Sequence, residues 1–113
     1  AHVEIELENM KTTNLRVIAA VAHGSVPGAE SSMLKIRGTE IRQEILSLIR
    51  RAMGPYALPF IEAAQYEGYA DAPVGPKEAA TAAANYFNYR KLSIFGGSNE
   101  IQKNIISKMI LGL

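Results

Sequence analysis

The chain has 113 residues, 48% of them hydrophobic and 20% charged, which is typical of a folded globular domain and not of a disordered one. The formal net charge is +1, and the 12 Lys and Arg are interleaved with the 11 Asp and Glu, so charge gives no reason to expect nucleic acid or an anionic membrane as a partner. The absence of cysteine excludes a disulfide framework, a thiolate zinc site and a cysteine nucleophile, and it fits the cytoplasmic location that we expect.

The first segment, residues 1–24, favours a helix over a strand. Val3, Ile5 and Leu7 alternate with polar residues, which is the period of a half-buried strand and remains the alternative. From Leu7 onward the apolar spacing suits one helical face, and no Gly or Pro interrupts it before Gly24. The sequence therefore predicts a helix over Val3–Ala22.

No signal peptide and no apolar run of about 20 residues, the length needed to span a bilayer, is visible.

Residues 30–53 form the clearest predicted helix. Their apolar residues recur at mostly helical spacings: Met33, Ile36, Ile41, Ile45, Leu48, Ile49 and Ala52. Gly38 in the middle costs about 1 kcal/mol relative to Ala, and a glycine there often permits close packing against another helix. Gly54 and Pro55 are expected to end the helix.

The next stretch, residues 55–77, is predicted to be a long connection with at most a short helix near Phe60–Tyr66. It holds all but one of the prolines, namely Pro55, Pro59, Pro73 and Pro76. The alanine-rich residues 77–94 then favour a helix. After the turn Gly96-Gly97-Ser98-Asn99 comes an amphipathic helix that Ser98 or Asn99 can cap.

Most candidate sites have an ordinary structural explanation. His2 and His23 lie far apart without carboxylates at metal-ligand spacing, so we expect surface histidines and no metal site. No nucleophile elbow, P-loop or dinucleotide fingerprint of the GxGxxG type is present. A phosphate-binding stripe carries little weight because acidic residues are mixed with its four arginines: Arg37, Arg42, Arg50 and Arg51.

The glycine turn at residues 96–99 is the exception. Two glycines let the backbone approach a ligand closely, and the helix that follows presents free N–H groups and a partial positive charge. Such an arrangement suits an anion such as phosphate. A turn with a purely structural role is the alternative.

The stretch YFNYRKLSIFGGSNEIQKNIISKMILGL resembles the C-terminal end of acyl-CoA dehydrogenases. In that family a helix leads into a Gly-Thr/Ser turn and continues as a helix with an EIQ and LGL pattern. The upstream stretch SMLKIRGTEIRQEILSLIRRAMG is similar to the preceding helix of the same domain. The resemblance implies an all-α fold, an antiparallel helical bundle forming an incomplete C-terminal four-helix domain. Residues 1–113 would belong to this domain, with its first helix and the upstream domains absent.

By implication, the parent enzyme binds FAD and acyl-CoA, oxidises the acyl-CoA to the 2,3-enoyl-CoA and passes electrons to an electron-transfer flavoprotein. Gly97, Ser98, Asn99 and Glu100 would contact the FAD. The segment from Arg51 to Pro55, which includes Gly54, would approach the FAD of a neighbouring subunit in a homo- or hetero-oligomer. Family members often have Gln and two glycines there, and Arg51 and Pro55 depart from that pattern.

The resemblance implies no catalytic residue in this chain. Many members place a catalytic glutamate directly before the turn glycine, where this chain has Gly96, which has no side chain to remove a proton. Either the base lies on the absent first helix, as in the isovaleryl type, or the chain is a non-catalytic subunit of a mixed oligomer. A hypothesis from another class is a small helical interaction module without a cofactor, whose apolar stripes contact partner helices.

Overall fold

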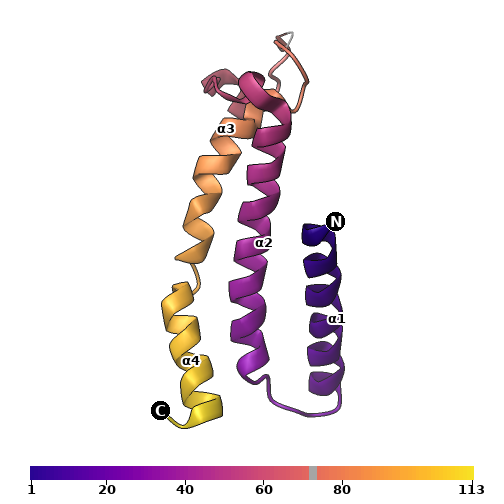
Figure 1. Ribbon diagram of the computed structural model, residues 1–113, viewed down its shortest axis with the longest axis vertical. Coiled ribbons are helices and arrows are strands. Elements are labelled where there is room, and N and C mark those ends of the chain that lie inside the picture. Colours follow the sequence, from indigo (N-terminus) through magenta and orange to yellow (C-terminus); the bar gives the residue numbers. More distant parts are fainter. Residues whose placement is uncertain (72–73) are drawn as a thin grey trace. The chain divides into compact units, whose positions relative to one another are not determined.

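The structure, a computed structural model, describes residues 1–71 and 74–113 (Figure 1). In chain order its elements are α1 His2–Ala22, α2 Ala29–Met53, the 3₁₀ helices η1 Gly54–Ala57 and η2 Glu62–Gln65, α3 Ala79–Asn88, the 3₁₀ helix η3 Tyr89–Ser93, and α4 Asn99–Leu111. No strand occurs in the described ranges, so the predicted all-α class is confirmed. Pro73, predicted to lie in the long connection, falls outside the described residues.

The start of the chain is helical. Helix α1 covers the predicted range Val3–Ala22 and begins one residue earlier, at His2, so the alternative strand is wrong. The uninterrupted run without Gly or Pro allows the helical hydrogen bonds to continue through the alternating residues. No residue of α1 is buried, and Ile5 and Ile18 remain more than half exposed.

Contacts within the chain divide it into two units, and α2 contributes to both. The first unit comprises residues 1–41 and 91–113, and the second comprises residues 42–90. Within the first unit, Figure 1 shows α1 and α4 on either side of the N-terminal part of α2, both running in the opposite direction to it. The antiparallel arrangement predicted for the helices therefore holds within this unit.

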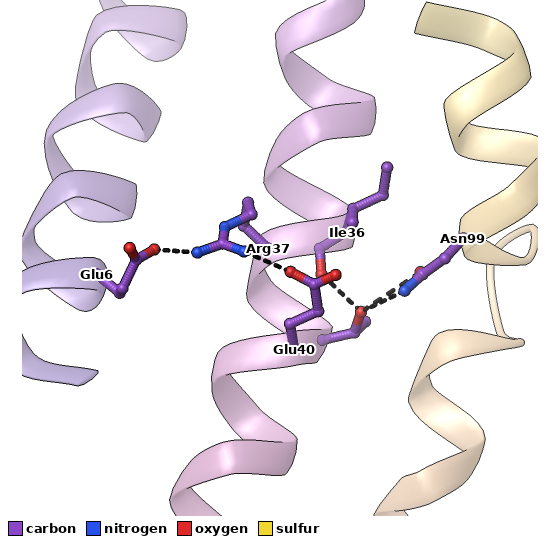
Figure 2. A network of polar contacts seen from close by, with 6 residues as sticks. Glu6, Ile36, Arg37, Glu40 and Asn99 are labelled. Carbon is purple, nitrogen blue, oxygen red and sulfur yellow. Dashed lines mark hydrogen bonds and ion pairs between the residues drawn. The ribbon is translucent and has the colours of Figure 1, made fainter. Parts of the chain in front are cut away.

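The first unit has a small core on α2, where Ile36 and Ile41 are buried. Gly38 lies where α1 approaches α2, because a Cβ atom at this position would be 3.4 Å from Met10 Sδ. This is an ordinary van der Waals distance, so Gly38 faces α1, but the spacing does not require a glycine there. An ion pair between Arg37 and Glu6 also joins the two helices (Figure 2).

In the second unit, α3 packs against η1 and η2. Small side chains form most of its core: Ala57, Ala79, Ala82 and Ala83 are buried together with Leu46. Because alanine has a short side chain, α3 can approach the neighbouring elements closely. The predicted short helix in the connection corresponds to η2 over Glu62–Gln65.

The helix predicted over residues 77–94 is an α-helix only as far as Asn88, and the prediction is wrong beyond it. The chain continues as the 3₁₀ helix η3, Tyr89–Ser93. Gln43 explains part of this change within the second unit, because its side-chain Nε2 donates to the carbonyl of Arg90 at 3.2 Å and to that of Tyr89 at 3.5 Å. A side chain from α2 therefore satisfies carbonyl groups that a continuing α-helix would bond itself.

Candidate cofactor-binding turn

The glycine turn between η3 and α4 requires the conformational freedom of glycine. Gly96 has φ 64° and Gly97 has φ 83°, both in the left-handed region. Gln102, from the first turns of α4, folds back over the turn and donates from Nε2 to the Gly96 carbonyl at 2.9 Å. A Cβ atom on Gly97 would be 2.9 Å from the same Nε2 atom, so no side chain fits at Gly97 without displacing Gln102.

Of the two predicted capping residues, Ser98 is the N-cap of α4. Its φ of −61° and ψ of 161° are extended, and its Oγ accepts a hydrogen bond from Ile101 N at 3.4 Å. Asn99 is already the first helical residue, and its side chain points from α4 toward α2 (Figure 2). Ser98 and Asn99 therefore hold α4 by different contacts.

Asn99 is paired with Thr39 of α2. The Thr39 Oγ1 atom donates to the Ile36 carbonyl at 2.8 Å, which uses its only proton. It then accepts a hydrogen bond from Asn99 Nδ2 at 3.3 Å. This assignment leaves Asn99 Oδ1 free to accept from another donor, and that donor is Lys35 Nζ at 2.8 Å. One amide side chain thus makes two contacts with α2 through its two ends.

Lys35 is the residue at this turn that our sequence analysis missed. Its Nζ atom also donates to the carbonyls of Gly97 at 2.7 Å and Ser93 at 3.3 Å. Lys35 and Thr39 are four residues apart on a helix and therefore share a face. That spacing is the only signal in the sequence, and it does not show which element the face contacts.

The arginines do not form a single phosphate-binding stripe. Arg37 is bound by Glu6 of α1 and by Glu40, whose Oε2 atom lies 2.6 Å from Arg37 Nη1 (Figure 2). The hydrogen bond to Glu6, followed by the charge of Glu6, raises the pKa of Arg37 above its ordinary value. In the second unit, Arg42 stacks on Tyr89 with its guanidinium carbon 4.7 Å from the ring centre.

The start of α4 provides two unsatisfied amide groups. The Ile101 N–H is bonded to Ser98, and the Glu100 N–H is bonded to the carboxylate of its own side chain. Within the described ranges, the N–H groups of Ser98 and Asn99 have no acceptor. An anion placed at this helix end therefore meets two free donors and the positive end of the helix dipole.

Glu100 opposes an anion at the same place. Its side chain is exposed, and hydrogen bonds from its own backbone N–H and from the Ser98 hydroxyl hold its pKa below the ordinary value. The charges of Lys103 and then of Lys35 make smaller contributions to the same lowering of this pKa. The two amides and the Lys35 charge fit a phosphate group, and Glu100 is the negative charge that any bound anion must avoid.

The remaining predicted contacts lie in the second unit. Arg51 is exposed in the last turn of α2, and Gly54 begins η1 with φ 54°. Apart from Gly54 and its two chain neighbours, no atom of the described residues lies within 4 Å of a Cβ atom built on Gly54, so backbone conformation and not crowding favours glycine there. Their role toward a cofactor of a neighbouring subunit stays a prediction.

No cluster in the described ranges is suited to a metal ion, since no three His, Cys, Asp or Glu side chains come together. No described helix is both long and apolar enough to cross a membrane. Gly96 is exposed and offers no acid or base.

Residues 1–111 match the family model described as acyl-CoA dehydrogenase, C-terminal domain. The chain therefore belongs to this family, as its C-terminal motif predicts. Comparison with curated proteins and with solved structures found no match.

Proposed function

We propose that this domain is the C-terminal part of an FAD-dependent acyl-CoA dehydrogenase that oxidises an acyl-CoA to the 2,3-enoyl-CoA. The family match over residues 1–111 supports the class of enzyme. The observation that carries the cofactor assignment is the turn before α4. There the backbone N–H groups of Ser98 and Asn99 have no acceptor and lie at the N-terminal, positive end of the helix.

The residues of the turn would bind the diphosphate of FAD. Ser98 and Asn99 would donate backbone hydrogen bonds, and the left-handed Gly97 would let the phosphates approach the main chain. The chemistry that FAD supplies in this family is acceptance of the hydride from the β-carbon of the acyl group. The contribution of this chain is to bind and orient the cofactor.

The base that removes the α-proton is not at the turn, because Gly96 occupies the position where many family members have a glutamate. We propose that another helix of the domain supplies it, as in the isovaleryl type. The alternative is that the chain is a non-catalytic subunit of a mixed oligomer. In that case we expect no glutamate on the helix that would otherwise supply the base. The electrons would pass to an electron-transfer flavoprotein in the cytoplasm.

The apolar faces of α1 and α4 support a second contribution. Ile18 of α1 is 55% exposed and Met109 of α4 is 57% exposed. In the dehydrogenase these faces would be covered by other parts of the enzyme, including neighbouring subunits in a homo- or hetero-oligomer. A helical interaction module without a cofactor would use the same faces, and flavin binding separates the two functions.

The first test is flavin content. The intact protein, purified without denaturation, is expected to be yellow and to contain about one FAD per chain, or to bind added FAD as the apoprotein. A colourless protein that leaves the fluorescence of added FAD unchanged would contradict the assignment and favour the interaction module.

The second test places a negative charge at the turn without removing the helix cap. Ser98→Asp keeps a good N-cap residue and brings a carboxylate beside the free amides. We expect FAD affinity to fall by about tenfold or more through repulsion of the phosphates. Asn104→Asp, an exposed change six residues further along the chain and beyond the first turn of α4, is the matched control. Equal FAD affinity in both variants would remove the turn from the cofactor site.

A further inference from the structure

Lys35 joins three successive parts of the chain at a single atom. Its Nζ donates to Ser93 O at the end of η3, to Gly97 O within the turn and to Asn99 Oδ1 at the start of α4. A lysine ammonium has three protons, so these contacts use its whole donor capacity. The contacts cross from α2 to residues about sixty positions further along the chain.

The turn needs such external support. Gly96 and Gly97 both adopt left-handed conformations, and glycine loses more conformational freedom on ordering than any other residue. The Lys35 contacts fix the chain before, within and after these glycines. They therefore limit the directions in which the N–H groups of Ser98 and Asn99 can point.

Among the residues that the structure describes, no carboxylate forms an ion pair with Lys35. All three acceptors are neutral carbonyl or amide oxygens. Lys11, by contrast, is exposed on α1 and lies 3.5 Å from the Glu8 carboxylate. The partly buried Lys35 thus places its ammonium group close to the start of α4, in contact with the Gly97 carbonyl and with Asn99.

We propose that Lys35 is a positioning residue for the cofactor: it holds the glycine turn in the conformation that binds phosphate and adds a positive charge behind it. The proposal rests on the function proposed above, in which the turn binds FAD. Lys35 would supply from α2 the support that orders the turn, because the residues of the turn do not provide this support themselves. Thr39 assists by holding Asn99 one helical turn further along α2.

The experiment compares four forms of the intact protein: the wild type, Lys35→Met, Lys35→Arg and the control Lys11→Met. Each is prepared as apoprotein, and its dissociation constant for FAD is measured by flavin fluorescence at low and high salt. Thermal unfolding is followed in parallel. Lys35→Met removes the charge and all three donors while keeping a side chain of similar length.

We expect Lys35→Met to weaken FAD binding by about tenfold to a hundredfold, the usual range for lost hydrogen bonds to a charged group. Its affinity should also depend less on salt than that of the wild type, because a charge near the phosphates has gone. Lys35→Arg should keep the wild-type salt dependence with weaker binding, since its planar guanidinium cannot direct three bonds from one nitrogen. Lys11→Met should bind as the wild type does.

The salt dependence of FAD affinity distinguishes a positioning residue from a purely structural one. If Lys35 had only a structural role, Lys35→Met would lower the unfolding temperature and leave the salt dependence of FAD affinity unchanged. If Lys35→Met binds FAD with wild-type affinity and salt dependence, the proposal is overturned. If Lys35→Met does not fold, Lys35→Gln is measured in its place. Wild-type FAD affinity and salt dependence in Lys35→Gln would also overturn the proposal. If the wild type itself binds no FAD, the proposed function fails, which is a different outcome.

Discussion

At the residue scale, the side chain of Asn99 shows how an uncharged group determines the position of a helix. Its carbonyl oxygen accepts from Lys35, and its amide nitrogen donates to Thr39, so both ends contact α2. The two neighbours fix which end of the amide is which, because an ammonium group can only donate. Asn99 therefore has a defined orientation, and a residue with one polar atom would not replace both contacts.

Thr39→Val tests this pair. The substitution keeps the shape of the side chain and removes the hydroxyl that receives Asn99 Nδ2. We expect the free energy of unfolding, measured by urea denaturation, to fall by about 1 kcal/mol more than in a variant that loses only a hydroxyl bond within one helix, because the partly buried hydrogen bond from Asn99 is lost as well as that to Ile36.

Thr13→Val is the matched control, since the Thr13 hydroxyl bonds only within α1, to the Asn9 carbonyl at 2.9 Å. An equal loss of stability in both variants would mean that the contact with Asn99 contributes nothing measurable.

At the scale of elements, α4 is stabilised at its first turn by a hydroxyl cap and a carboxylate. Ser98 caps the helix, and Glu100 lies in its first turn, where a negative charge interacts favourably with the helix dipole. Lys108 in the last turn complements the other end, and Gly112 ends the helix in the left-handed conformation with φ 69°.

Glu100→Gln is expected to reveal a pH-dependent contribution. Because the folded pKa of Glu100 lies below its ordinary value, its carboxylate stabilises the fold above the unfolded pKa, and this contribution is lost as pH falls through the lowered folded pKa. The variant should therefore be less stable than the wild type at neutral pH, and the two should converge in acid.

Urea denaturation over a pH series measures this difference, with Glu67→Gln, outside the described helices, as the control for loss of one charge. A stability difference between Glu100→Gln and the wild type that stays constant from neutral to acid pH would contradict the role of Glu100.

The elements differ in how far the sequence predicts them. The spacing of apolar residues, together with the glycines and prolines that end helices, predicts α1, α2 and α4. Ser98 is likewise predicted as a possible cap. Both kinds of prediction succeed because they depend on residues close in sequence. The end of α3 at Asn88 depends on Gln43, and the geometry of the glycine turn depends on Lys35. Both side chains come from α2, and the sequence pattern of α2 does not show which later carbonyls they reach.

At the scale of the whole molecule, the exposed apolar surface is the feature with the largest consequence. On α4 alone, the large exposed apolar residues are Ile101, Ile105, Met109, Ile110 and Leu111. Soluble monomers rarely expose contiguous apolar patches of this kind. The 113-residue chain produced alone is therefore expected to self-associate, as sedimentation velocity would show.

Ile110→Lys should reduce this association, because it places a charge on the apolar surface of α4, where Ile110 is 66% exposed. Val26→Lys is the control, at a residue that is 88% exposed in the loop between α1 and α2. A monodisperse monomer in the unsubstituted chain would argue against these faces as contact surfaces.

The three hydrogen bonds that Lys35 donates also affect its chemical reactivity. An amine attacks a thioester through its lone pair, and Lys35 presents instead three N–H bonds, each directed to an oxygen. In the proposed dehydrogenase, which would hold activated acyl groups, surface lysines without such contacts would be open to adventitious acylation. The contacts that order the turn would therefore shield Lys35 from the acyl-CoA of the proposed enzyme.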